Sequence, residues 1–440
     1  MAAIGVESGS LKVGPRTAVL TFQGLSLAEL QDEEVLFFIR IRGKKSYFRS
    51  VYPKALLDQF CRLREFRTIS EYRYDANVYI DLNRFDPRET SEREKSIIAQ
   101  CVDEADVIQR CRGLRNIDEV DARNLIISCA RFFIDCFSGS QLKLIVSGAV
   151  DNYVMDLMVR IAKQFGIKVM GVTQSFLHPH YHLVTIRGEH NHLREPSDHE
   201  IATIVDRLES GARSAMVTRR YPAIFNAFYT AASFYYRCVV RYLIGYRLLG
   251  NRAFEYRFAP WFRGLYVPSQ LWAARLLNDG SALENLDPPS SVYIPLHCVP
   301  EATVDYWMED SANADYLSVV LRVAKHYSDR GFSVVLKEHP AFYLCRTEAF
   351  YRRLLEIPRV TILSPFVLTN DVFAKVSLVV VWSGSTGVEA LVRGLNVRVV
   401  GENYYSAGSI PNYLQPETEQ VKVTPRDVIK RVLQTSLPAS

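Results

Sequence analysis

The sequence contains no apolar run as long as the roughly 20 residues that a membrane-spanning helix needs. Its opening stretch, MAAIGVESGSLKVGPRT, lacks the basic and apolar regions of a secretory signal peptide. The eight cysteines are scattered and form no CxxC or Cys/His metal-binding spacing. Together these absences predict a protein of the reducing cytosol that is neither secreted nor embedded in a membrane.

The sequence also has little excess of one charge over the other. The 53 Lys and Arg residues face 48 Asp and Glu residues, which leaves a formal net charge of +5. That is too little for a dedicated nucleic-acid-binding protein unless the charge is concentrated, and we expect no nucleic-acid partner. With 440 residues, 48% apolar and 23% charged, the chain has the composition of a globular protein of two or three domains.

Short apolar strands alternate with helical segments along the chain. LKLIVS at 142–147, a helix over 154–165 and IKVMGVT at 167–173 predict a βαβ unit. Five further strands are expected at 291–296, 332–337, 360–364, 378–383 and 397–401. Such strands, separated by helices, specify parallel sheets that are buried on both faces. The fold class expected is therefore α/β, with two Rossmann-like domains, 1–265 and 266–440, that face a cleft.

The strongest chemical signal is the stretch WSGSTGVEA, in which a buried strand ends and small residues open a helix. The first N–H groups of a helix lack partners within it, and its positive end attracts anions. Glycine allows close approach, so two hydroxyls and these amides predict a phosphate cradle, with a glutamate one turn later placed to bind ribose hydroxyls. Alternatively, the hydroxyls only cap the helix and the glutamate only complements its dipole. The residues are Ser383, Gly384, Ser385, Thr386, Gly387 and Glu389.

The segment LKEHP at 336–340 directly follows another strand of the predicted C-terminal sheet. Ligands of open α/β sheets lie beyond the carboxyl ends of the strands, where the Gly-Ser-Thr-Gly turn is also expected. Pro340 disfavours helix at His339 and leaves the imidazole directed into the crevice. His339 and Lys337 are therefore candidate contacts for a nucleotide phosphate, although His-Pro is also an ordinary loop dipeptide.

Four segments together resemble the capsule polysaccharide biosynthesis family. They are PLHCVPEAT at 295–303, LKEHP at 336–340, SPF at 364–366 and WSGSTGVEALVRGLNVRVVGENYYS at 382–406. Members of that family look like GT-B glycosyltransferases, and characterised relatives transfer Kdo from CMP-Kdo. The His-Pro and Ser/Thr motifs are also similar to those that hold CMP in bacterial sialyltransferases.

The resemblance assigns roles to particular residues. It implies that His339, Ser385 and Thr386 bind the donor phosphate and that Glu389 binds the ribose. His297 and Glu301, in the PLHCVPE segment, are expected to face the same cleft.

The function implied is transfer of Kdo or a related acidic sugar from a CMP-activated donor to a capsular or other surface polysaccharide. No metal or other cofactor is expected, because helix ends stabilise the leaving phosphate. Two alternatives stay open: a UDP-sugar 2-epimerase of the same architecture, and a non-catalytic partner in polysaccharide assembly or export.

Inverting transfer needs a side chain that takes the proton of the acceptor hydroxyl. Asp151, in the turn GAVDN after a predicted strand, is the first candidate, and Glu189, in RGEHN, is the second. Aspartate is also a common turn residue, so a purely local role for Asp151 is the alternative.

Histidines alternate in FLHPHYH and in EHNH. An extended chain would place several imidazoles on one face, as zinc binding requires, but no fourth ligand is defined and we predict no metal site. A structural cluster, or contacts with the acceptor or a phosphate, are the other interpretations. The residues are His178, His180, His182, His190 and His192.

A basic aromatic segment, residues 219–263, contains eight arginines, fourteen aromatic residues and one acidic residue, Glu255. Such interleaving binds nucleic acid, an anionic membrane surface or an acidic polysaccharide. Helical spacing through 224–249 favours an amphipathic helix on the inner face of the plasma membrane. In the alternative interpretation the helix lies between domains and its arginines cover apolar surface.

Overall fold

The computed structural model describes most of the chain. The described residues are 19–39, 52–60, 67–70, 78–177, 180–210, 225, 228, 229, 232, 236, 273–299, 301–309, 311–343, 346–406, 408–415 and 423–439. The predicted domain boundary at residue 265 and most of the basic aromatic segment lie outside them, so the boundary stays a prediction. Within the described residues, no helix combines the length and apolarity needed to cross a bilayer.

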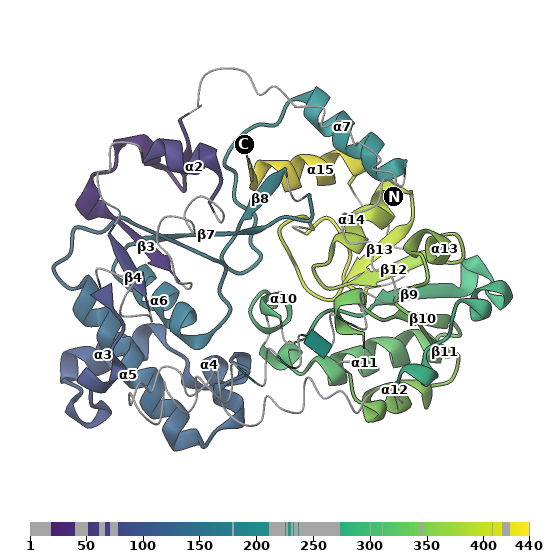
Figure 1. Ribbon diagram of the computed structural model, residues 1–440, viewed down its shortest axis with the longest axis horizontal. Helices are drawn as coiled ribbons and strands as arrows, with labels where there is room; N and C mark the ends of the chain where they lie inside the picture. Colours follow the sequence, from purple (N-terminus) through teal and green to yellow (C-terminus); the bar gives the residue numbers. More distant parts are fainter. Residues whose placement is uncertain are drawn as a thin grey trace.

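A five-stranded parallel sheet forms the C-terminal half (Figure 1). Its order is β11-β10-β9-β12-β13, so the chain moves outward from the central β9, returns, and continues on the other side. The crevice above the carboxyl ends of β9 and β12 is therefore the topological switch point, where open α/β sheets bind ligands. The strands are β9 (Ser291–Pro295), β10 (Ser333–Lys337), β11 (Val360–Leu363), β12 (Leu378–Val381) and β13 (Asn396–Val399).

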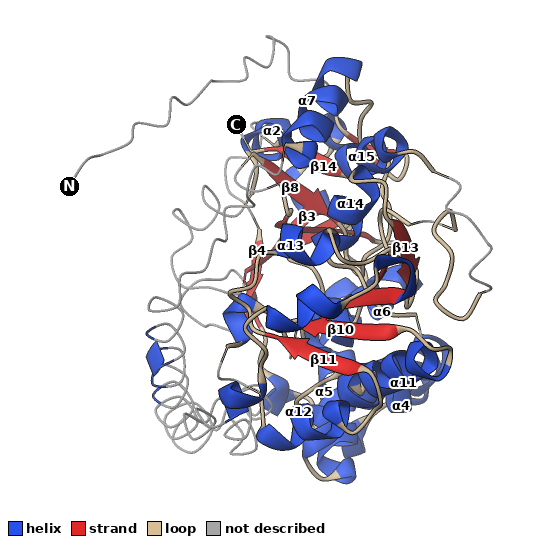
Figure 2. Cartoon of the chain, turned by 90° about the vertical axis from the view of Figure 1, so that its right-hand side faces the viewer, coloured by secondary structure: helices blue, strands red, loops and turns tan. Residues whose placement is uncertain are grey.

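Helices cover both faces of this sheet, as Figure 2 shows from the side. Val292 and Ile294 of β9 belong to the core formed with α11 and α12, whereas Tyr293 faces the core formed with α13 and α14. Burial on both faces explains why the strands are continuous apolar runs. The helices are α10 (Ala302–Asp305), α11 (Tyr316–Asp329), α12 (Glu348–Leu355), α13 (Thr369–Phe373) and α14 (Ser385–Val392).

The N-terminal half contains a seven-stranded mixed sheet in the order β14-β8-β7-β6-β3-β4-β5. The strands from β7 to β5 are parallel, and β8 and β14 are antiparallel to their neighbours. The bounds are β3 (Val35–Ile39), β4 (Thr68–Ser70), β5 (Val78–Tyr79), β6 (Leu144–Ser147), β7 (Lys168–Gln174), β8 (Tyr181–Val184) and β14 (Ser436–Pro438). The predicted βαβ unit is confirmed as β6, α6 and β7.

Helices α5 and α6 pack together on one face of this sheet, and many of their side chains are buried in its core. The N-terminal helices are α2 (Lys54–Gln59), α3 (Glu92–Cys101), α4 (Glu104–Arg110), α5 (Glu119–Phe137), α6 (Tyr153–Gln164) and α7 (Asp198–Glu209). A small hairpin, β1 (Thr21–Phe22) and β2 (Leu25–Ser26), precedes β3. The predicted fold class, with a Rossmann-like α/β domain in each half of the chain, is confirmed.

The end of the chain returns to the first sheet. Helix α15 (Pro425–Gln434) packs against α7 and α14, and β14 then pairs with β8. In Figure 1 the yellow α15 lies beside the teal α7. Residues 436–438, which the sequence assigned to the C-terminal domain, thus form an edge strand of the N-terminal sheet, and Leu437 is buried in its core.

An arginine at the end of α4 joins the two halves. Arg110 donates hydrogen bonds to the carbonyl oxygens of Met308 and Glu309, each at 2.6 Å. On the other side of this contact, the absent side chain of Gly188 leaves room for Trp307, because a Cβ there would lie 3.0 Å from the ring. The two domains therefore meet through buried, directional contacts close to the carboxyl edges of both sheets.

Candidate active site

The predicted phosphate cradle lies at the start of α14, directly beyond β12. Gly384 is the N-cap, with φ −71° and ψ 151°, and it provides no side-chain cap for the first turn. The helix begins at Ser385, two residues before the predicted start at Gly387, so Ser385 and Thr386 are its first two residues. Neither hydroxyl residue is the N-cap, and the capping alternative does not account for them.

Close backbone approach explains the glycines of the cradle. A Cβ on Gly387 would lie 2.7 Å from the hydroxyl of Tyr405, which itself donates a 3.0 Å hydrogen bond to the Gly384 carbonyl. A Cβ on Gly384 would lie 3.2 Å from the imidazole of His297. Ser383, between strand and cradle, is buried, and its hydroxyl has no hydrogen-bond partner among the described residues.

Both predicted histidines lie just beyond the carboxyl ends of adjacent strands, β9 and β10. His297 follows β9 and packs edge-on against Trp382, at 5.7 Å between ring centroids. His339 follows β10, with its Nδ1 2.9 Å from the Sγ of Cys298. Burial, reinforced by nearby cations, lowers the pKa of His297 to about 3 and that of His339 to about 4. Both imidazoles are therefore neutral at physiological pH and act as hydrogen-bonding groups rather than cations.

The cation of this site is Lys337, at the carboxyl end of β10. Its ammonium donates a 3.0 Å hydrogen bond to the hydroxyl of Thr369 on α13. Burial lowers the pKa of Lys337 to about 8, although Glu389 on α14 opposes the shift. Burial likewise raises the pKa of Glu389, which accepts a 3.3 Å hydrogen bond from Ser385. Lys337 and Glu389 thus lie on the same side of the sheet as the cradle.

Sequence reasoning missed the pair that holds the two histidine loops together. Arg346 donates to the carboxylate of Glu338 at 2.7 Å and also to the carbonyl of His297. The other oxygen of Glu338 accepts the backbone N–H of His339 at 2.5 Å. Pro340 begins the short turn that follows. A single buried guanidinium therefore connects both loops, and the only sequence signal was a charged residue, Glu338, at the end of a buried strand.

A second cluster of carboxylates forms where the domains meet. Arg112 contacts the carboxylate of Asp151 and lies 3.0 Å from that of Asp305. Burial lowers the pKa of Arg112, but Asp151 and Asp305 more than offset this and raise it. Burial raises the pKa of Asp305 and also that of Glu301, which interacts with Arg112 and Asp151. The structure thus brings the predicted residues Asp151 and Glu301 together across the interface.

Glu189 has a local structural role. Its two carboxylate oxygens accept backbone hydrogen bonds from Ile186 and Arg187, each at 2.7 Å, and one oxygen also accepts from the amide of Asn191. These contacts close the turn that places Gly188 against Trp307. These contacts give Glu189 a local structural role, and its part in acid or base chemistry stays a prediction.

The histidine segments are dispersed. His178 lies outside the described residues, His180 is exposed, and His182 is opposite Leu437 in the β8–β14 pair. Burial lowers the pKa of His190, and His192 lies 3.0 Å from Glu195. Among the residues that the structure describes, no group of three or more His, Cys, Asp or Glu side chains is arranged to hold a metal ion.

The fold defines an α/β protein with two Rossmann-like domains, in which α14 begins at the switch point of the C-terminal sheet. A sequence profile of the family described as "Capsule polysaccharide biosynthesis protein" matches residues 155–436, more than half of the chain. The chain belongs to this family, as its motifs predicted. No curated protein matches it in sequence.

Three solved structures to which the chain has low similarity are two transferases and an epimerase. The beta Kdo 2,7 transferase of Thermosulfurimonas dismutans KpsC is 10% identical, with a TM-score of 0.33 over 78% of this chain and 88% of that one. Its beta Kdo 2,4 transferase is 12% identical, with a TM-score of 0.32 over 66% and 79%. UDP-GlcNAc 2-epimerase from Methanocaldococcus jannaschii is 9% identical, with a TM-score of 0.25 over 91% of each chain.

Proposed function

We propose that the protein is a metal-independent glycosyltransferase of capsule assembly. It transfers Kdo or a related acidic sugar from a CMP-activated donor to a capsular or other surface polysaccharide. Family membership supports the role in capsule biosynthesis. The observation that carries the reaction class is the close approach of His297 to Gly384, the N-cap of α14, at the switch point of the C-terminal sheet, with His339 beside Cys298 in the adjoining loops.

In this proposal the donor phosphate lies at the start of α14. The first-turn amides and the Ser385 and Thr386 hydroxyls donate to its oxygens, and the helix end and Lys337 supply positive potential. The neutral His339 donates a further hydrogen bond, and Glu389 accepts from the ribose hydroxyls. These groups stabilise the negative charge that grows on the CMP phosphate as the bond to the sugar breaks.

The acceptor hydroxyl requires a base from the opposite wall. We propose Asp151 for this role, because it belongs to the N-terminal domain and its side chain is 32% exposed beside the interface. Arg112 fixes its position. Glu301, on the C-terminal side of the interface at the start of α10, is the second choice, since burial raises its pKa toward the range in which a carboxylate is an effective general base.

The double variant Ser385→Ala, Thr386→Ala tests the cradle. Each hydroxyl lost removes a hydrogen bond to a charged group worth about 1.5–3 kcal/mol, so CMP should bind at least about tenfold more weakly by titration calorimetry. Thr203→Ala on the exposed face of α7 is the matched control. CMP binding by the double variant as tight as that of the wild type would show that the cradle is wrongly assigned.

A nucleotide panel identifies the donor. CMP should raise the melting temperature more than CDP, UDP or GDP, because a ligand that binds only the folded state stabilises it. Preference for UDP, with interconversion of free UDP-sugars in the absence of acceptor, would favour the epimerase alternative. Nucleotide binding without transfer to an authentic acceptor would favour the non-catalytic assembly partner.

Chelation tests the metal-independent part of the proposal. Helix amides, hydroxyls and Lys337 would stabilise the negative charge of the phosphate, which a divalent cation does in other transferases. We therefore expect sugar transfer to persist in excess EDTA. Complete loss of transfer that Mg²⁺ restores would contradict this expectation.

We also propose that the protein binds the inner face of the plasma membrane through the basic aromatic segment. Within it, Phe225, Phe228, Tyr229 and Tyr236 are helical and exposed, and their spacing places them on one face. The sequence adds eight arginines, and each engaged arginine contributes about 1 kcal/mol of attraction to anionic lipid.

A liposome flotation assay tests this localisation. The wild type should float with anionic vesicles at low salt and be released at high salt, because ions screen the attraction. Charge reversal at Arg237, Arg241 and Arg247, which lie outside the described residues, should abolish flotation and leave CMP binding unchanged. Equal flotation of variant and wild type would mean that the arginines have another role.

A further inference from the structure

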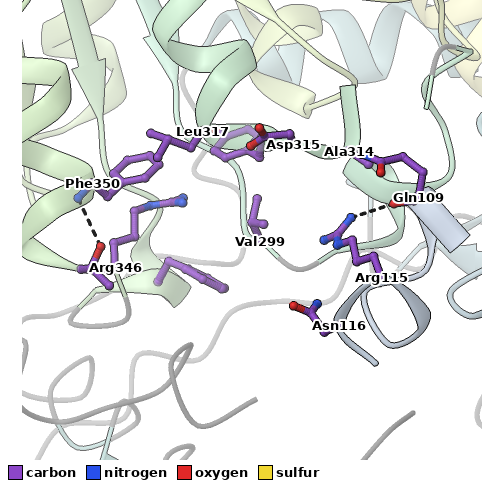
Figure 3. Close-up of a pocket in the computed structure, with 12 residues that line it drawn as sticks. Gln109, Arg115, Asn116, Val299, Ala314, Asp315, Leu317, Arg346 and Phe350 are labelled. Atoms are coloured by element: carbon purple, nitrogen blue, oxygen red, sulfur yellow. Dashed lines mark hydrogen bonds between the residues drawn. The ribbon is translucent and has the colours of Figure 1, made fainter. Parts of the chain in front are cut away.

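A cavity of about 500 Å³ opens between the two domains (Figure 3). Gln109 and Arg115, from α4 and the turn after it, line the N-terminal side. Phe350 of α12 and Arg346 line the C-terminal side, with Val299 between the walls. The cavity lies at the start of α11 and α12, whereas the cradle lies at the start of α14 across the sheet.

Two guanidinium groups face this cavity from opposite walls (Figure 3). Arg115 donates to the Gln109 carbonyl at 3.1 Å and lies 3.5 Å from Asp305. Arg346 is held by Glu338 and the His297 carbonyl. Each guanidinium has five N–H donors, so both retain donors for a ligand after these contacts.

Among the described residues that line the cavity, the carboxylate of Asp315 is turned toward its own helix. Asp315, the N-cap of α11, accepts hydrogen bonds from the backbone and the hydroxyl of Ser318, at 3.4 and 2.6 Å. The lining therefore favours an anionic group between Arg115 and Arg346 over a cation.

The rest of the lining fits a sugar ring. Tyr316, Phe342 and Phe350 surround Arg346, with its guanidinium carbon 5.5, 5.2 and 4.8 Å from the ring centroids. Apolar surfaces with a few fixed polar groups are typical of small-molecule sites, and the volume lies in their usual range of about 300–1,000 Å³. The side chains of Gln109, Asn116 and Thr347 add hydrogen-bonding groups for hydroxyls.

We infer that this cavity binds one negatively charged sugar unit of the glycan acceptor, with its carboxylate held between Arg115 and Arg346. The assignment to the acceptor rests on the proposed function. The loop of His297, Cys298 and Val299 is the wall that the cavity shares with the proposed nucleotide site. Contributions from both domains mean that the site is complete only when the domains are docked as observed.

The test compares two sugars that differ at one carbon. D-Glucuronate carries a C6 carboxylate where D-glucose carries a hydroxymethyl group, and saturation-transfer NMR titration measures the binding of each to the full chain. Glucuronate should bind about tenfold more tightly than glucose, as expected for a carboxylate between two guanidinium groups. Arg115→Gln should remove this preference, whereas the control Arg123→Gln on α5 should not.

Arg115→Gln is expected to fold, because the buried carboxylate of Asp305 still has its ion pair with Arg112, at 3.0 Å. Leu317→Trp, which fills the cavity from α11, is a second variant and should weaken binding of both sugars. Equal affinity for the two sugars, no detectable glucuronate binding, or displacement of glucuronate by CMP would each overturn the inference. If CMP fails to bind while the glucuronate preference and its dependence on Arg115 persist, the nucleotide assignment falls and the acidic-sugar site stands.

Discussion

Replacing Arg346 by methionine should lower the free energy of unfolding by about 3–5 kcal/mol, the usual cost of leaving a buried charge without its partner. The side chain of Glu338 is fully buried and that of Arg346 is 5% exposed. The same change frees the carbonyl of His297, so the two histidine loops lose their common anchor. We therefore expect CMP binding to weaken as well, measured by calorimetry at a temperature where the variant is folded.

Two further variants separate the buried charge from other effects. Arg352→Met removes an arginine of α12 whose pair with Glu348 is about half exposed, and it should cost less than about 1 kcal/mol in urea denaturation. Adding Glu338→Gln to Arg346→Met should recover much of the lost stability, because no unpaired charge then remains. A loss for Arg346→Met no larger than that for Arg352→Met would contradict the role given to this pair.

Replacing Arg112 by methionine should also cost about 3–5 kcal/mol at neutral pH, because the fully buried carboxylate of Asp305 is left with Arg115 alone, at 3.5 Å. Arg112 is also the link between Asp151 of the N-terminal domain and Asp305 of the C-terminal domain. Its loss should therefore weaken domain docking and expose the interface to proteolysis.

This second loss of stability should depend on pH. Burial already raises the pKa of Asp305, so the native state binds a proton at a higher pH than the unfolded state does. Such a group costs stability above its folded pKa, and the cost disappears as pH falls through that pKa toward the unfolded value of about 3.9. Removal of Arg112 raises the pKa further. The difference in stability between variant and wild type should therefore be largest at neutral pH and shrink on acidification.

The free energies of unfolding of the wild type and of Arg112→Met are measured by denaturation across the acid range. Subtracting one from the other removes the pH dependence that the two proteins share. The double variant Arg112→Met, Asp305→Asn should show a deficit that changes little with pH, because the titrating group is gone. A deficit for Arg112→Met that grows on acidification would mean that Asp305 is not the group left unpaired.

The sequence by itself determined the C-terminal fold and the main parts of its proposed donor site. Continuous apolar strands separated by helices are typical of a parallel sheet covered on both faces, and because its strands run in the same direction, the loops after them lie at one edge. The cradle and LKEHP were recognisable because their residues are adjacent in sequence and follow strands directly. The motifs around them were also sufficient to predict the family.

Only the tertiary structure decided which distant side chains meet. Arg346 reaches a carbonyl 49 residues away, and Arg115 reaches Asp305 across 190 residues. A single charged residue in a loop has no periodicity, so its partner is set by how the chain packs. The same reason explains why the order of the first sheet and the return of β14 could not be predicted: three-residue strands such as Ser436–Pro438 gain their stability from the strand beside them rather than from their own sequence.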